Sequence, residues 1–249
     1  LRLPQFIIGG APRCGTTWLY RLADRHASLA MAKPVTPEPK FFLVDSQYER
    51  GLSHYSETWF ANLPADRTAG EKSTNYLESS LAAARISQDL PNVKMIFILR
   101  NPVDRAYSNF LWSTINGLET ESFEQALALE RMRESTLPEA LRYARPFSYF
   151  SRGLYATMLE PWLKLFPRSQ MLILKTEDIA SSPRAVAGRL YEFLEVASLP
   201  ELSDGLGIVN ASEPGLAVLD RDVRLALEDR YREPNMRLQK MLGANFQPW

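Results

Sequence analysis

The sequence of 249 residues is poor in three features that mark common protein classes: cysteine, histidine and net charge. Its single cysteine, Cys14, excludes an internal disulfide and favours a reducing compartment. One cysteine and two histidines offer few ligands for a transition metal, so we expect no catalytic metal. Lys and Arg (29) balance Asp and Glu (29), which argues against nucleic acid as a partner. Any basic site must therefore be local.

Long apolar runs are missing as well. No segment reaches the roughly 20 apolar residues of a membrane-spanning helix, and no basic region followed by an apolar stretch stands at the N-terminus. We therefore expect a cytoplasmic protein without a membrane span. The chain starts with Leu1 rather than methionine, which leaves an N-terminal extension open. Its length and its 45% hydrophobic content predict one globular domain, residues 1–249.

Strand-like and helix-like patterns alternate along the chain. Strands are expected at residues 6–8, 93–99 and 171–174, with a weaker candidate at 68–73. Helices are expected at residues 16–26, 55–60, 78–90, 101–114, 154–166, 183–194 and 220–242. The proline-rich residues 28–42 lack periodicity and predict an extended loop. The alternation predicts an α/β fold with a central parallel sheet flanked by helices.

Residues 116–150 are helical in pattern but more polar than the other helices. We interpret them as a helical excursion that faces the substrate.

The most informative stretch is FIIGGAPRCGTTWL, residues 6–19, where a strand, a glycine turn and a helix follow one another. The backbone N–H groups of such a turn and the positive end of the helix dipole attract one anion. Gly10 and Gly15 have the spacing of the triphosphate-binding motif G-x-x-x-x-G-K-[ST], but Thr16 stands in place of its lysine. The cation, Arg13, lies inside the loop instead. Alternatively, the glycines only connect the strand to the helix.

The second strong strand, residues 93–99, ends in Arg100 rather than in the acidic residue that would hold Mg²⁺ beside a triphosphate. This predicts metal-free chemistry in which arginine and lysine neutralise charge. Ser108 follows two helical turns later, and an arginine with a hydroxyl could hold a second phosphate group. In the simpler alternative, Arg100 pairs with Asp104 and Ser108 is an ordinary helix residue.

Cys14 beside Arg13 at a helix N-terminus raises the possibility of a cysteine phosphatase. That chemistry requires the spacing C-x₅-R, but Tyr20 occupies the arginine position and the arginine is Arg21. We therefore expect Cys14 to contribute only its backbone N–H.

Together these stretches resemble the sulfotransferases that use 3′-phosphoadenosine 5′-phosphosulfate (PAPS), nearer the heparan-modifying and related bacterial branch than the cytosolic aryl and steroid branch. GAPRCGTT is similar to the 5′-phosphosulfate loop and FILRNPVDRAYSNF to the 3′-phosphate site. Weaker matches are EPKFF, EKSTNY and RGLYATMLEPWLKLFP. The resemblance implies a P-loop-like three-layer fold in a single sulfotransferase domain. It also implies PAPS as co-substrate, 3′-phosphoadenosine 5′-phosphate (PAP) as product, and no metal.

The resemblance assigns roles to individual residues. It implies a phosphosulfate cradle of Arg13, Cys14, Gly15, Thr16 and Thr17, and a 3′-phosphate site of Arg100 and Ser108. Arg13 stands where this branch usually has lysine and would neutralise the leaving oxygen. Glu38 matches the base that deprotonates the acceptor, provided that Lys72 does not trap it in an ion pair. Lys72 matches a lysine near the transferring sulfuryl group.

Both assignments have simpler alternatives. Glu38 can be read as a solvated loop carboxylate, and Lys72 as the partner of Glu71 or Glu78.

The sequence also departs from this branch. Residues 208–219, IVNASEPGLAVL, have no lysine or arginine where the branch has a basic loop over the nucleotide, so Asn210, Ser212 or backbone groups would replace it. Neutral charge favours a small hydroxylated metabolite of bacterial secondary metabolism, a lipid, a sugar or a carrier-bound acyl group as acceptor over a heparan polymer. Two further functions stay open at this point: a P-loop kinase or nucleotide hydrolase, and a non-catalytic nucleotide-binding module. The oligomeric state is also open.

Overall fold

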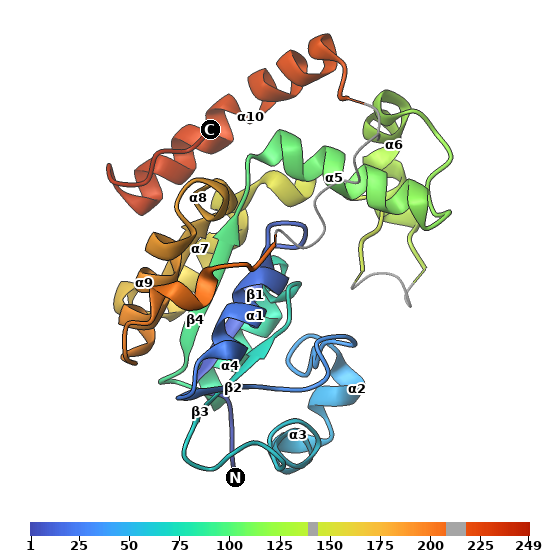
Figure 1. Ribbon diagram of the computed structural model, residues 1–249. Coiled ribbons are helices and arrows are strands. Elements are labelled where there is room, and N and C mark those ends of the chain that lie inside the picture. The colour runs from blue at the N-terminus through green and yellow to red at the C-terminus, as the bar shows by residue number, and fades with distance from the viewer. Residues whose placement is uncertain (139–143, 208–217) are drawn as a thin grey trace. The chain divides into compact units, whose positions relative to one another are not determined.

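The computed structural model describes residues 1–138, 144–207 and 218–249. Its chain divides into two compact units, one of Leu1–Leu99 with Pro161–Val209 and one of Arg100–Glu160 with Asn210–Trp249. Figure 1 labels the elements of both units. Within the described ranges, no helix combines the length and apolar character needed to cross a membrane.

The first unit is built on a five-stranded sheet with the order β2-β3-β1-β4-β5, in which all neighbours are parallel. The strands are β1 (Phe6–Gly10), β2 (Leu29–Met31), β3 (Thr68–Lys72), β4 (Lys94–Leu99) and β5 (Met171–Lys175). Ile8 of β1 aligns with Lys72 on one side and with Ile96 on the other. β1 is therefore central, and the strand order reverses beside it, which is where open α/β sheets bind ligands at their carboxyl edge.

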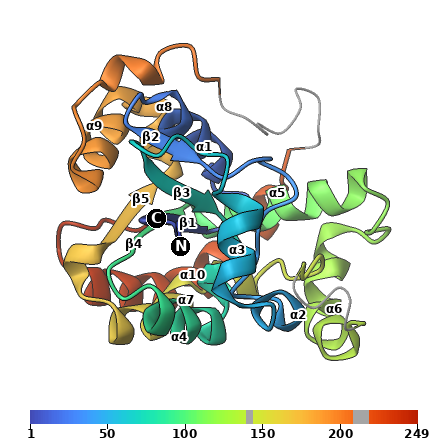
Figure 2. The ribbon, with the colours of Figure 1, turned by 90° about the horizontal axis from the view of Figure 1, so that it is seen from below.

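Helices cover both faces of this sheet. The helices that lie wholly in the first unit are α1 (Thr16–Arg25), α2 (Asp45–Tyr48), α3 (Gly51–Trp59), α4 (Ser80–Asp89), α8 (Thr176–Ser181) and α9 (Pro183–Leu194). Figure 2 shows α1 and α9 on one face and α4 on the other. Because both faces are covered, β1 is apolar throughout, and Phe6, Ile7 and Ile8 are fully buried. The predicted three-layer α/β fold is confirmed.

Helix α7 (Tyr155–Leu165) begins in the second unit and ends in the first. In the first unit its Trp162 packs edge-on against Phe97 of β4, with ring centroids 5.1 Å apart. The indole N–H of Trp162 also donates to the carbonyl of Leu77, at 3.2 Å. A buried tryptophan thus fills the apolar layer while its one polar group is satisfied.

The expected strands at residues 6–8, 68–73, 93–99 and 171–174 are present, but three short elements, β2, α2 and α8, were not predicted. Strand β2 lies inside the residues expected to form an extended loop. It lies beside β3 at the edge of the sheet, and its three residues are too few for the pattern to show a period of two. Helix α8 follows β5 directly and was not predicted, because six residues give less than two helical turns.

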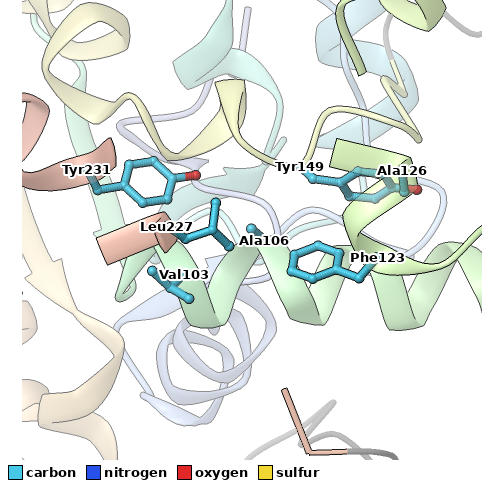
Figure 3. Close-up of a cluster of buried hydrophobic side chains, with 7 residues drawn as sticks. All are labelled: Val103, Ala106, Phe123, Ala126, Tyr149, Leu227 and Tyr231. Atoms are coloured by element: carbon cyan, nitrogen blue, oxygen red, sulfur yellow. The ribbon is translucent and has the colours of Figure 1, made fainter. Parts of the chain in front are cut away.

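The second unit has its own core, made by α5 (Pro102–Ile115), α6 (Phe123–Thr136) and α10 (Arg221–Leu242). Its buried cluster, shown in Figure 3, consists of Val103, Ala106, Phe123, Ala126, Tyr149, Leu227 and Tyr231. As predicted, Asn101 caps α5: its side chain accepts from the N–H of Val103 at 2.9 Å, and Pro102 is the first helical residue. Residues 116–150 are not only an excursion, since Phe123, Ala126 and Tyr149 belong to this core.

Candidate active site

The loop between β1 and α1 in the first unit is held tightly from two sides. The N–H of Ala11 donates to the carbonyl of Ile98 in β4, at 2.8 Å. A Cβ added at Gly10 would lie 2.9 Å from the carbonyl oxygen of Thr74 and 2.7 Å from the Cβ of Leu77. Only glycine fits there, so the loop runs directly against the segment that follows β3.

The start of α1 is arranged to receive an anion. Gly15 is its N-cap with a left-handed φ of 93°, which glycine adopts without strain. Within the described part of the chain, no side chain caps the first turn, and that turn contains no acidic residue. Thr16 and Thr17 are the first helical residues, and Arg13 lies in the loop before them. N–H groups at such a terminus attract negatively charged oxygen.

Cys14 lies inside this turn with its side chain fully buried. Its Sγ is 3.5 Å from the carbonyl of Pro12, to which the thiol donates. A thiol buried in this way has no access to a substrate, so the expectation that Cys14 contributes only backbone is consistent with its burial.

Thr176, the first residue of α8, ties the loop to the sheet and was not singled out from the sequence. Its hydroxyl lies 2.5 Å from the carbonyl oxygen of Cys14 and 3.0 Å from that of Leu99, and its one proton is shared between them. The loop and the end of β4 are therefore fixed to each other. The sequence carried one indication of this role, because Thr176 directly follows a buried parallel strand, at the sheet edge where ligands bind.

Glu38 and Lys72, which are 34 residues apart, form an ion pair in the first unit. Their side chains are 12% and 5% exposed, so the interpretation of Glu38 as a solvated loop carboxylate is wrong. Thr74 donates to Glu38 twice, from its N–H at 3.2 Å and from its hydroxyl at 3.1 Å. The ammonium of Lys40 lies 3.9 Å from the same carboxylate. Thr74 was not predicted, although it stands in the EKSTNY stretch two residues after Lys72.

The segment after Glu38 is anchored by hydroxyl groups and aromatic rings. The N–H of Lys40 donates to Ser73 Oγ at 2.9 Å, and the N–H of Phe42 donates to the Tyr76 hydroxyl at 3.3 Å. Between them, the ring of Phe41 stacks on that of Tyr55 with centroids 4.3 Å apart. Glu38 therefore projects from a fixed backbone.

Arg100 and Ser108 belong to the second unit, whereas the other candidates belong to the first. The carbonyl of Arg100 accepts from the Tyr155 hydroxyl at 2.9 Å, and Ser108 on α5 is 3% exposed. Asp104 pairs with Arg224 of α10 at 2.6 Å, so this carboxylate has a partner other than Arg100, with which the simpler alternative paired it. The late segment expected to close over the nucleotide is residues 208–219. Its residues 208–217, which include Asn210 and Ser212, lie outside the described residues.

The carboxyl edge of the parallel sheet carries a glycine-bounded loop before a helix N-terminus and a largely buried Glu–Lys pair, an arrangement of an α/β protein that suits an anionic group. Comparison with known proteins gives the family. The sequence profile of the family described as "Sulfotransferase domain" matches residues 3–205. The chain therefore belongs to the sulfotransferase family, as the motifs predicted.

Three known proteins illustrate the relationship. Mouse heparan sulfate glucosamine 3-O-sulfotransferase 3B1 is 30% identical over 98% of this chain and 65% of its own length. Human bifunctional heparan sulfate N-deacetylase/N-sulfotransferase 3 is 29% identical over 99% of this chain and 31% of its own length. The chain thus spans less than two thirds of either relative. The crystal structure of a sulfotransferase from Alicyclobacillus acidocaldarius matches with a TM-score of 0.78 and 27% identity, covering 97% of this chain and 96% of that one.

Proposed function

We propose that this protein is a PAPS-dependent sulfotransferase of the EC 2.8.2 type, which moves a sulfuryl group from PAPS to a hydroxyl or amine of its acceptor. The observation that carries the proposal is the pairing of Glu38 with Lys72 at the carboxyl edge of the sheet. The same edge holds the anion loop, because Thr74, which binds Glu38, also packs against Gly10. A base and a cation thus lie next to a site suited to a phosphosulfate.

The donor would be bound by two sets of residues. Arg13, Gly15, Thr16, Thr17 and the backbone of Cys14 would hold the 5′-phosphosulfate. Arg100 and Ser108 would hold the 3′-phosphate. The fit of the first set rests on its chemistry: an N-terminal helical turn without an acidic residue, a cation in the loop, and a glycine where a Cβ would collide with backbone.

The transfer step needs a base, an in-line acceptor and cations around the departing oxygen. As the acceptor oxygen bonds to sulfur, the bond from sulfur to the bridging phosphate oxygen breaks and PAP leaves. The acceptor proton passes to Glu38. Arg13 and Lys72 offset the charge that grows on the leaving oxygen and around the sulfuryl group, which is the task of metal ions in phosphoryl transfer.

The ion pair between Glu38 and Lys72 is closed in the structure, so the mechanism includes an exchange of partners. The lysine ammonium turns from Glu38 to the sulfuryl oxygens of the donor, and one carboxylate oxygen becomes available to the acceptor. Thr74 keeps the carboxylate in place during this exchange, since both of its donors bind Glu38 independently of Lys72.

For the acceptor we propose a small molecule, a lipid, a sugar or a carrier-bound acyl group, contacted by residues 116–150. The equal numbers of basic and acidic residues support this choice over a highly charged polymer, which a basic surface would bind better. We further propose a cytoplasmic protein whose residues 1–249 act as one catalytic domain without a metal.

Calorimetric titration with PAP tests the donor site, beside adenosine 5′-phosphate, ADP and ATP with and without Mg²⁺. We expect binding that needs the 3′-phosphate and does not need the metal. A preference for ATP with Mg²⁺ would refute the sulfotransferase and favour a P-loop kinase or nucleotide hydrolase.

A second measurement addresses transfer itself. Labelled PAPS is incubated with a simple sugar, a fatty alcohol, an acyl thioester with a hydroxyl group, and an unsulfated heparan oligosaccharide. We expect label in one of the first three. PAP binding without transfer to any acceptor or to water would favour the non-catalytic module.

A further inference from the structure

A second glutamate is linked through Ser73 to the segment that follows Glu38 and has no part in the proposed transfer step. Glu71 is the neighbour of Lys72 on β3 and is 0% exposed. Successive side chains of a strand point to opposite faces. Lys72 therefore reaches Glu38, while Glu71 enters the interior beside the hydroxyls of Tyr55 and Tyr76.

The carboxyl group of Glu71 is connected to the backbone after Glu38. The hydroxyl of Ser73 donates to Glu71 Oε2 at 3.4 Å and accepts from the N–H of Lys40 at 2.9 Å. The hydroxyl of Tyr76, which adjoins Glu71, accepts from the N–H of Phe42 at 3.3 Å. Two N–H groups of residues 40–42 thus depend on hydroxyls gathered around one buried acid.

We infer that Glu71 is a positioning residue: through Ser73 and Tyr76 it fixes the backbone of residues 40–42 and so directs the carboxylate of Glu38. The inference rests on the proposed function, because it takes Glu38 as the base.

Glu71 acts in its neutral form at neutral pH. Burial raises its pKa to about 8, because a buried charge loses its hydration. The hydroxyls of Tyr76 and Tyr55 favour the charged form without offsetting burial, and the negative charge of Glu38 raises the pKa further.

Among the described residues whose side chains influence the pKa of Glu71 most strongly, none is a cation, and Lys72 points to the opposite face of the strand. Helix α3 brings Tyr55, the turn after β3 brings Tyr76, and the loop brings Glu38. The flanking strand β1 brings Ile7, which aligns with Glu71. Burial raises the pKa of both tyrosines, so they are neutral as well.

Two buried polar atoms near Glu71 also support its neutral form. Within the described part of the chain, Glu71 Oε1 and the Tyr55 hydroxyl have no hydrogen-bond partner. An ionised carboxylate would leave Oε1 without a donor, whereas a neutral acid can carry its proton on that oxygen.

Ionisation of Glu71 above pH 8 would add a second negative charge close enough to Glu38 to interact with its carboxylate. We expect this repulsion to disturb the position of the Glu38 carboxylate and turnover to fall in this alkaline range.

The test compares Glu71→Gln, Glu71→Leu and Ser73→Ala with the control Ser87→Ala. Ser87 is a half-buried serine of α4 whose hydroxyl donates to its own helix, at 2.8 Å from the carbonyl of Ala84. Three quantities are measured on the whole chain: backbone amide hydrogen exchange at Lys40 and Phe42, the affinity for PAP, and the rate of PAPS hydrolysis with water as acceptor between pH 6 and 9.

We expect Ser73→Ala to speed exchange at Lys40 and to lower the hydrolysis rate, each about tenfold, with PAP affinity changed less than twofold. Glu71→Leu should act in the same way, and Ser87→Ala should change nothing. Glu71→Gln, a neutral group of the same shape, should keep the exchange rates and remove the fall in rate above pH 8.

Unchanged exchange at residues 40–42 in Ser73→Ala would overturn the inference, and so would an alkaline fall that persists in Glu71→Gln. Should Glu71→Leu not fold, these two variants still decide the matter. Failure of the proposed function has a different signature, because hydrogen exchange does not depend on turnover. If Ser73→Ala shows faster exchange but Glu38→Gln still hydrolyses PAPS, the anchoring of residues 40–42 is supported and Glu38 is not the base.

Discussion

Replacing Glu71 by glutamine should change how the stability of the protein depends on pH. The ordinary pKa of the glutamate is 4.5, and burial raises it to about 8 in the folded protein. Between these values the folded state holds a proton that the unfolded chain has released. The free energy of unfolding therefore falls as pH rises, by about 1.4 kcal/mol for each pH unit.

The size of the effect follows from the same two values. The contribution is fully present below pH 4.5 and is lost as pH rises to about 8. Over this range the loss is on the order of 5 kcal/mol, of which roughly 3 kcal/mol has been lost at pH 7. Glutamine carries no charge at any of these pH values. We therefore expect Glu71→Gln to lack this slope and to gain stability over the wild type steadily from pH 5 to pH 8.

Urea unfolding followed by tryptophan fluorescence and circular dichroism, at one-unit pH intervals from 5 to 9, measures the difference. Similar slopes with denaturant in both proteins would show that the compared states are alike. Glu57→Gln, at an exposed glutamate on α3, controls for the loss of one carboxyl group. A difference between wild type and Glu71→Gln that stays constant across this range would refute the argument that Glu71 is a buried neutral acid.

Three further outcomes are expected. Glu38→Gln should lower turnover of PAPS by about 10²-fold to 10⁴-fold, as for loss of a general base, and leave the calorimetric affinity for PAP nearly unchanged; weakened PAP binding would contradict this role. Arg100→Ala should weaken PAP binding by about 10-fold to 100-fold, as for a lost hydrogen bond to a charged group. It should leave the binding of adenosine 5′-phosphate, which has no 3′-phosphate, unchanged. Equal effects on both ligands would show that Arg100 does not bind the 3′-phosphate. Thr176→Val should destabilise the protein by about 1–3 kcal/mol in urea unfolding, because two buried carbonyls lose their donor, and it should weaken PAP binding. Thr176→Ser keeps the hydroxyl and should have normal stability and normal PAP binding. A Thr176→Val variant with normal stability would refute the link between loop and sheet.

Local features of the sequence were enough to predict the loop between β1 and α1. A strand, a glycine turn and a helix start occupy one continuous stretch, so the spacing of Gly10, Gly15 and Thr16 already encodes a turn and a helix N-terminus. The apolar run of β4 and the Asn101–Pro102 start of α5 are local in the same sense. The helix starts at Thr16 and Pro102 depend on hydrogen bonds between residues a few positions apart, whereas β4 is marked by its apolar run although its hydrogen bonds join it to the distant strands β1 and β5.

The functional state of the side chains was decided by the tertiary structure. Strand β2 exists because β3 offers an edge to three residues whose own pattern predicts a loop. Lys72 meets Glu38 rather than its sequence neighbour Glu71, because the strand sends adjacent side chains to opposite faces. Glu71 keeps its proton because distant aromatic residues exclude water around it. Sequence spacing determines which groups a short segment contains, but only the packing of distant segments determines which charges are paired, buried or neutral.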